Sequence, residues 1–209
     1  MQAEWYFDFI SPFSYLQLGK VQKWRERIEI TPVPIALGAI LNHTGTLGPA
    51  EVPGKREFMY RFIVWQAEQD GIELRFPPAH PFNPLTALRL CVAAGTTWES
   101  VEKIYAHIWR DGKAGVTPDD LADVGASLDI DNVENAANAA NVKTQLRTNT
   151  DGAIAAGVFG VPTLRIGGEH FWGNDASSMI DAWLDDPTHF DSAEYRRVAT
   201  LPTGVERRR

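Results

Sequence analysis

Strand-like segments occur only near the two ends of this chain, and the residues between them have a helical pattern. Residues 3–10 are aromatic and β-branched, and residues 28–35 alternate in character, as strands do. Residues 161–166 and 169–172 flank the turn Gly167–Gly168, which predicts a β-hairpin. Both ends of the chain are therefore needed to complete one mixed sheet.

A predicted helix joins the first two strands. Pro12 suits a first-turn position, where its missing N–H costs nothing, and apolar residues then recur at helical spacing as far as Trp24. A strand, a helix and a second strand most economically form a right-handed parallel βαβ unit. Pro32 and Pro34 predict that the second strand lies at an edge of the sheet or ends early.

The middle of the chain is predicted to be helical. Four segments with helical periodicity or alanine-rich composition cover residues 55–70, 84–94, 98–111 and 131–156. Asn83 and Thr97 are candidate N-caps, and a further helix is expected to start after Thr117.

A last helix is expected over residues 175–184, capped by Asn174 or Asp175, and the polar remainder should pack on the surface or fray. The predicted fold class is α/β, with one discontinuous domain over residues 1–40 and 157–186. An all-helical insertion over residues 41–156 interrupts this domain, and a tail over residues 187–209 follows it.

Charge and composition exclude several classes of partner. The 209 residues carry a formal net charge of −7, so a duplex phosphate backbone would be repelled. A basic cluster, Arg207 to Arg209, fits a solvated tail better than a nucleic-acid surface. The N-terminus lacks signal-peptide features, and no segment is apolar for long enough to span a bilayer. We therefore expect neither a nucleic-acid nor a membrane partner, and a cytoplasmic location.

The single cysteine limits redox and metal chemistry. Cys91 lies in an apolar run and is predicted to be a buried small hydrophobe, and one cysteine cannot form a CxxC motif or an internal disulfide. The five histidines lack the spacing of metal ligands, so no metal is predicted. His80, beside Pro81, is the histidine best placed to line a cleft.

Ser11 stands at the junction between the first strand and the first helix. The N–H groups and macrodipole of a helix N-terminus favour an anion, and this field lowers thiol pKa values in thioredoxin-type sites. Ser11 could therefore donate a hydrogen bond to a thiolate brought in by a cofactor. Alternatively, Ser11 only caps the helix.

Two further segments near the second half of the sheet could bind a peptide-like ligand. Pro162 opens a strand after Val161, which is similar to the cis-proline loop of thioredoxin-like folds, where the backbone of the preceding residue pairs with an extended peptide. A plain edge proline is the alternative. Asp175, at a helix start, could either cap that helix or bind the ammonium of a γ-glutamyl group.

Four segments together resemble one enzyme family. They are Phe7 to Leu16, Pro81 to Arg89, Gly157 to Thr163 and Phe171 to Asp175. With them, the chain resembles the 2-hydroxychromene-2-carboxylate isomerase family, which is related to kappa-class glutathione transferases and more distantly to DsbA-like oxidoreductases. The resemblance implies a thioredoxin-like fold with a helical insertion, glutathione as cofactor, a homodimer and a role in aromatic catabolism.

The resemblance also implies roles for individual residues. Ser11, at the position of the reactive cysteine of redox relatives, would contact the glutathione sulfur as the catalytic residue, and Val161 with Pro162 would pair with the peptide backbone. The γ-glutamyl end would be bound by Trp172, Gly173, Asn174 and Asp175. Substrate contacts would fall at Asn42, Gly54, Lys55 and Arg56. Asn83, which lies close to two prolines, is a separate candidate that could orient a ligand. Asn42 stands where a lysine is expected in the naphthalene-pathway isomerases, so Lys55 or Arg56 would supply the charge for the substrate carboxylate.

For Lys55 and Arg56 a solvated helix N-terminus is an equal alternative, and Asn83 could simply be an N-cap. The predicted activity is isomerisation of an aromatic or unsaturated 2-oxo acid-like small molecule by reversible addition of the glutathione thiolate. A kappa-like glutathione transferase is the nearest alternative, and a non-catalytic glutathione- or peptide-binding protein is a further one. A disulfide oxidoreductase is disfavoured because there is no CxxC motif.

Overall fold

The two ends of the chain form one sheet. The computed structural model describes residues 2–205 and contains four strands in the order β2-β1-β3-β4. The strands are β1 Gln2–Phe7, β2 Glu29–Pro34, β3 Thr163–Ile166 and β4 Glu169–Trp172. β1 is parallel to β2 and antiparallel to β3, which forms a hairpin with β4. The predicted βαβ unit, the hairpin and the edge position of the proline-containing strand are confirmed.

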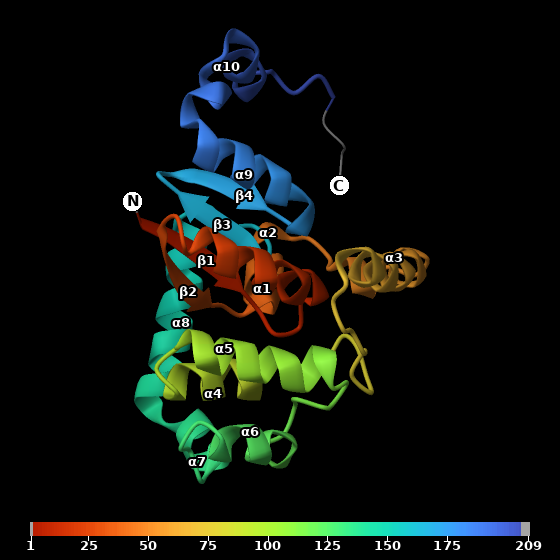
Figure 1. The fold of residues 1–209 in the computed structure, drawn as a ribbon, viewed down its shortest axis with the longest axis vertical. Helices are drawn as coiled ribbons and strands as arrows, with labels where there is room; N and C mark the ends of the chain where they lie inside the picture. The colour runs from red at the N-terminus through yellow and green to blue at the C-terminus, as the bar shows by residue number, and fades with distance from the viewer. Residues whose placement is uncertain (1, 206–209) are drawn as a thin grey trace.

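Helices surround this sheet in layers (Figure 1). They are α1 Pro12–Trp24, α2 Leu37–Thr44, α3 Lys55–Asp70, α4 Leu85–Ala93, α5 Trp98–Tyr105, α6 Ala122–Ala126, α7 Val133–Asn138, α8 Ala140–Ala155, α9 Ser177–Asp185 and α10 Ala193–Ala199. Helices α4 and α5 form a layer on the side of the sheet opposite α9, and α3 lies apart at the side of the molecule. None of the described helices combines the length and apolar composition needed to cross a bilayer.

Two of the predicted boundaries were wrong. The helix expected over residues 131–156 is two helices, because Ala139 has an extended backbone with ψ of 137°. The polar remainder, expected to pack on the surface or fray, contains a 3-10 helix, Pro187–Asp191, and the exposed helix α10. The first strand ends at Phe7 instead of Ile10, because the chain turns at Asp8. The cluster Arg207 to Arg209 lies outside the described residues.

The turn at Asp8 is stabilised by its own carboxylate. Asp8 is fully buried, and its two oxygens accept hydrogen bonds from the N–H of Ile10 at 3.0 Å and of Leu37 at 2.8 Å. Such bonds satisfy buried backbone donors that no neighbouring strand reaches. One side chain thus links the end of β1 to the start of α2.

Two side chains from the inserted helices also form hydrogen bonds with the backbone of this turn. The hydroxyl of Tyr105 donates to the carbonyl of Asp8 at 3.0 Å, and Nε1 of Trp109 donates to the carbonyl of Phe9 at 2.8 Å. Trp109 lies in a π-helical turn, Ala106–Arg110, which continues α5. The rings of Tyr105 and Phe9 are also in contact, with centroids 4.7 Å apart. The helical block therefore shares one core with the sheet and supports the loop before α1.

Removing the Tyr105 hydroxyl tests this support. Tyr105→Phe keeps the buried ring and removes one buried hydrogen bond, so the free energy of unfolding should fall by about 1 kcal/mol. Tyr195→Phe, at a ring that is 40% exposed, is the matched control and should leave the value unchanged. Urea unfolding followed by fluorescence measures both, and equal stability of the two variants would contradict the assigned role.

Candidate active site

Ser11 caps helix α1. Its Oγ accepts a hydrogen bond from the N–H of Ser14 at 3.2 Å, and the residue is only 6% exposed. The capping interpretation is therefore confirmed. A capping hydroxyl uses only a lone pair, however, so its proton remains available to an anion at the helix N-terminus. Both interpretations of Ser11 are thus chemically compatible.

The Val161–Pro162 peptide bond is cis, as predicted. The carbonyl of Pro162 accepts a hydrogen bond from the N–H of Gly173 at 2.8 Å. Within residues 2–205, neither the N–H nor the C=O of Val161 has a backbone partner. This residue therefore offers a free donor and a free acceptor to an extended chain.

Helix α1 is tied directly to the loop around Gly173. Gln17 is fully buried, and its amide donates to the carbonyl of Gly173 at 3.0 Å while accepting from Nε1 of Trp5 at 2.8 Å. Gly173 also bonds to Pro162, so the structure brings the Ser11 helix, the cis-proline loop and the loop after β4 together. Gln17 was not predicted from the sequence, although a glutamine between Leu16 and Leu18 on a buried helix is a detectable signal.

Asn174 or Asp175 was predicted to cap α9, but neither side chain does so. A 3-10 turn, Asn174–Ala176, precedes the helix, and neither side chain makes a capping bond. Asn174 is 3% exposed, and its Oδ1 accepts from Nζ of Lys20 at 3.1 Å. Its Nδ2 is buried without a partner among the described residues, whereas Asp175 is exposed. A buried amide donor without a protein partner is an unusual feature that a ligand could complete.

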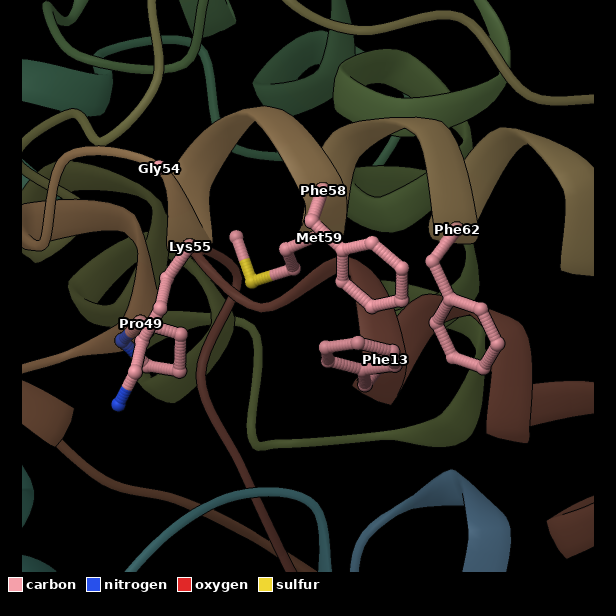
Figure 2. Close-up of a pocket in the computed structure, with 7 residues that line it drawn as sticks. All are labelled: Phe13, Pro49, Gly54, Lys55, Phe58, Met59 and Phe62. Carbon is pink, nitrogen blue, oxygen red and sulfur yellow. The ribbon is translucent and has the colours of Figure 1, made fainter.

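An apolar pocket adjoins the start of α1. Its volume is about 450 Å³, and its lining is Phe13, Pro49, Gly54, Lys55, Phe58, Met59 and Phe62. Figure 2 shows Phe58 and Phe62 projecting from α3 toward Phe13, which is two residues after Ser11, with Lys55 at one end. The aromatic lining suits a flat apolar group, and the ammonium of Lys55 suits an anion at its edge.

Only part of the predicted substrate set reaches this pocket. Gly54 and Lys55 line it, whereas Asn42, Arg56 and Asn83 do not. Arg56 donates through Nε to the carbonyl of Ala50 at 2.7 Å, and Oδ1 of Asn83 accepts from the N–H of Leu85 at 3.1 Å. Asn42 is exposed on α2. The pocket phenylalanines were not predicted as site residues because, in the sequence, they are indistinguishable from core residues.

Comparison with known proteins agrees with this geometry. The model of the DsbA-like thioredoxin domain matches residues 2–185. The chain belongs to the DsbA-like thioredoxin-domain family. It is 27% identical to a protein named glutathione S-transferase kappa 2 of Caenorhabditis elegans, over 88% of this chain and 92% of the relative. It is 29% identical to a 2-hydroxychromene-2-carboxylate isomerase of Sphingobium xenophagum, over 88% and 97% of the two chains.

A solved structure extends the agreement to three dimensions. The 2-hydroxychromene-2-carboxylate isomerase structure superimposes with a TM-score of 0.76 at 25% identity, covering 97% of this chain and 100% of the other. The DsbA-like thioredoxin domain, the predicted resemblance to 2-hydroxychromene-2-carboxylate isomerases and the thioredoxin-like fold class with its many helices are therefore confirmed.

The one cysteine of this DsbA-like protein lies outside the site. Cys91 is fully buried on α4, and burial raises the pKa of its thiol to about 12. A thiol with so high a pKa is not a nucleophile near neutral pH. Within residues 2–205, no three His, Cys, Asp or Glu side chains are grouped to hold a metal ion.

The DsbA-like fold places one unusual carboxyl, that of Asp8, three residues before Ser11. Burial raises the pKa of Asp8 to about 7, and the N–H groups of Ile10 and Leu37 oppose that rise. The unfolded carboxyl has a pKa near 3.9, so between about pH 4 and pH 7 the folded protein binds the extra proton. The free energy of unfolding should therefore fall as pH rises through this window, by at most about 1.4 kcal/mol per pH unit.

Comparison with Asp8→Asn isolates this contribution, because the amide does not titrate. The difference in unfolding free energy between wild type and Asp8→Asn should change in favour of the variant from pH 4.5 to pH 7 and then level off. Denaturant unfolding at several pH values measures it. A difference that stays constant, or changes in favour of wild type, would contradict the raised pKa.

Proposed function

We propose that this protein is a glutathione-dependent isomerase of the 2-hydroxychromene-2-carboxylate isomerase type. The observation that carries the proposal is the cap of α1, where the hydroxyl of Ser11 lies at a helix N-terminus beside an apolar pocket that also contains Lys55. Such an enzyme needs a hydrogen-bond donor that stabilises the thiolate and a pocket that binds an aromatic acid. The relatives with 29% identity carry the same activity in their names.

The described residues fit glutathione. The free N–H and C=O of Val161 suit its peptide backbone, and the unpartnered Nδ2 of Asn174 suits its glutamyl carboxylate. The exposed Asp175 carboxylate suits its ammonium, and Trp172, which is 54% exposed, offers a ring face next to that loop. When bound, glutathione supplies a thiolate that adds to a double bond of the substrate and is later eliminated.

Ser11 and helix α1 would stabilise that negative charge. The Ser11 hydroxyl donates its proton as a charge-assisted hydrogen bond while its lone pair caps Ser14. The partial positive charge of the helix N-terminus adds to this effect, and each unit by which a thiol pKa falls requires about 1.4 kcal/mol. These two contributions suffice to lower a thiol pKa of about 8.5 toward neutrality.

The pocket defines the proposed substrate class. Phe13, Phe58 and Phe62 would pack against an aromatic or unsaturated group, and Lys55 would pair with a carboxylate. Asn42, Arg56 and Asn83 remain proposed as outer contacts. The proposal therefore concerns an aromatic 2-oxo acid-like substrate in aromatic catabolism, acted on by a cytoplasmic homodimer. Val64 and Trp65, apolar side chains that α3 exposes outside this pocket, support a surface that a second copy covers.

Ser11→Ala tests whether the Ser11 hydroxyl stabilises the bound thiolate. The variant should keep glutathione binding within a few-fold but lose about 100-fold in turnover, since a hydrogen bond to a charged group contributes about 1.5–3 kcal/mol. Loss of the cap alone costs about 1 kcal/mol of stability. Thr97→Ala is the matched control, because Thr97 caps α5 through the N–H of Ser100 in the same way.

The control should lose the same stability and keep full turnover. Steady-state kinetics and isothermal titration of glutathione give the two readouts. If the two variants had equal turnover, Ser11 would act only as a cap.

Thiol balance separates the isomerase from a kappa-like glutathione transferase, which the relative with 27% identity favours. With a 2-hydroxychromene carboxylate, product should form over many turnovers while free thiol stays constant, because the thiolate is eliminated again. With a chlorinated aromatic acceptor, little thiol should be consumed. Stoichiometric thiol loss in every productive reaction would contradict the isomerase activity and support the transferase activity instead.

A further inference from the structure

His80 is enclosed by four aromatic rings. It lies between α3 and α4, and its ring centroid is 5.3 Å from that of Tyr60, 5.4 Å from Trp109, 6.0 Å from Phe76 and 6.3 Å from Phe82. All four contacts are edge-on, a favourable arrangement for aromatic pairs. The imidazole is therefore held in one orientation.

Its orientation directs one ring nitrogen at the loop before Ser11. Nε2 of His80 is 2.9 Å from the carbonyl oxygen of Ile10. That carbonyl belongs to the peptide group whose N–H is that of Ser11, and this N–H donates to the carbonyl of Asp8 at 2.9 Å. The peptide plane that enters Ser11 is thus held at both of its ends.

The contacts also define which nitrogen carries the proton. A carbonyl oxygen can only accept, so Nε2 must be protonated. Nδ1 is 2.7 Å from the hydroxyl of Tyr60, which is also 2.7 Å from the carbonyl of His80. When the ring is neutral, Tyr60 donates its single proton to Nδ1. When the ring is charged, Nδ1 donates to the oxygen of Tyr60, and Tyr60 donates to the carbonyl of His80.

Both protonation states therefore keep the contact with Ile10. Burial and then the nearby Arg56 charge lower the pKa of His80, while the bond to Ile10 raises it. The packed surroundings are otherwise the rings named above, so the neutral ring with its proton on Nε2 prevails at neutral pH. The hydrogen bond from His80 to Ile10 is therefore present whether the imidazole is neutral or charged.

We propose that His80 is a positioning residue for Ser11. His80 holds the Ile10–Ser11 peptide plane and thereby restricts the φ torsion of Ser11. This torsion places the Cβ of Ser11 and hence its hydroxyl. Tyr60 connects this contact to α3, where the adjacent Met59 lines the apolar pocket. The inference rests on the proposed function, since the hydroxyl is oriented for a bound thiolate, and it adds a residue from the helical insertion to the site.

The test compares two histidines whose Nε2 atoms contact backbone carbonyl oxygens. His80→Ala removes the donor to Ile10, and His80→Gln restores an amide donor at similar reach. His107→Ala is the matched control, because Nε2 of the buried His107 likewise contacts a backbone oxygen, that of Ala114, at 2.8 Å. Tyr60→Phe, which leaves Nε2 in place, is a milder variant that is available if His80→Ala does not fold.

Three readouts are needed. Ultraviolet absorbance of bound glutathione against pH gives the thiol pKa, steady-state kinetics give kcat and KM, and amide hydrogen exchange follows residues 8–14 without any ligand. His80→Ala should raise the thiol pKa by about one unit, a tenfold loss of thiolate at neutral pH. It should lower kcat by about tenfold, leave KM for glutathione within twofold, and speed amide exchange in the loop.

His80→Gln should recover most of these losses, Tyr60→Phe should show smaller ones, and His107→Ala should show none of them despite lower stability. Equal thiol pKa, kcat and exchange in His80→Ala and His107→Ala would overturn the positioning role. Absence of a thiolate signal in wild type would overturn the proposed function, and the exchange difference would then still decide the role of His80 at the loop.

Discussion

The backbone between β1 and α1 leaves the sheet before the helix begins, so its buried polar groups need partners from elsewhere. Side chains supply these partners: the Asp8 carboxylate within the loop itself, Tyr105 and Trp109 from the inserted helices, and His80 from the segment between α3 and α4. A buried carbonyl without a partner is costly, so these bonds constrain the loop to one conformation. The position of Ser11 follows from that constraint, and so does the contact between the helical block and the sheet.

Much of this architecture could be predicted from local patterns. The strand, the proline at the start of α1 and the hairpin turn each depend on nearby residues, and the cis bond before Pro162 was expected from its place before a strand. Ser11 was correctly expected at a helix N-terminus. These features share one property: neighbours in the sequence determine them.

Other features depend on contacts across the fold, and the sequence alone did not reveal them. The position of Gln17 on a buried helix is visible in the sequence, but its partner Gly173 is not, because it lies 156 residues along the chain. The break at Ala139 has no glycine or proline to signal it, and Asn174 resembled a helix cap but instead accepts a bond from Lys20. The pocket phenylalanines were missed for the same reason, because an aromatic stripe on a helix predicts a core as readily as a ligand surface.

The position of β1 in the sheet has a consequence for synthesis of the protein. Ala3 pairs with Ile30 on one side and with Ile166 on the other, so the central strand meets its second neighbour only after the whole helical block has been made. Pairing across so long a separation is slow, because the loop-closure entropy must be overcome first. On a ribosome, a chain that ends before β3 therefore exposes one edge of an aromatic strand. Unpaired strand edges are prone to aggregate during folding, and the candidate-site residues from the two halves of the chain come together only after β3 has been made.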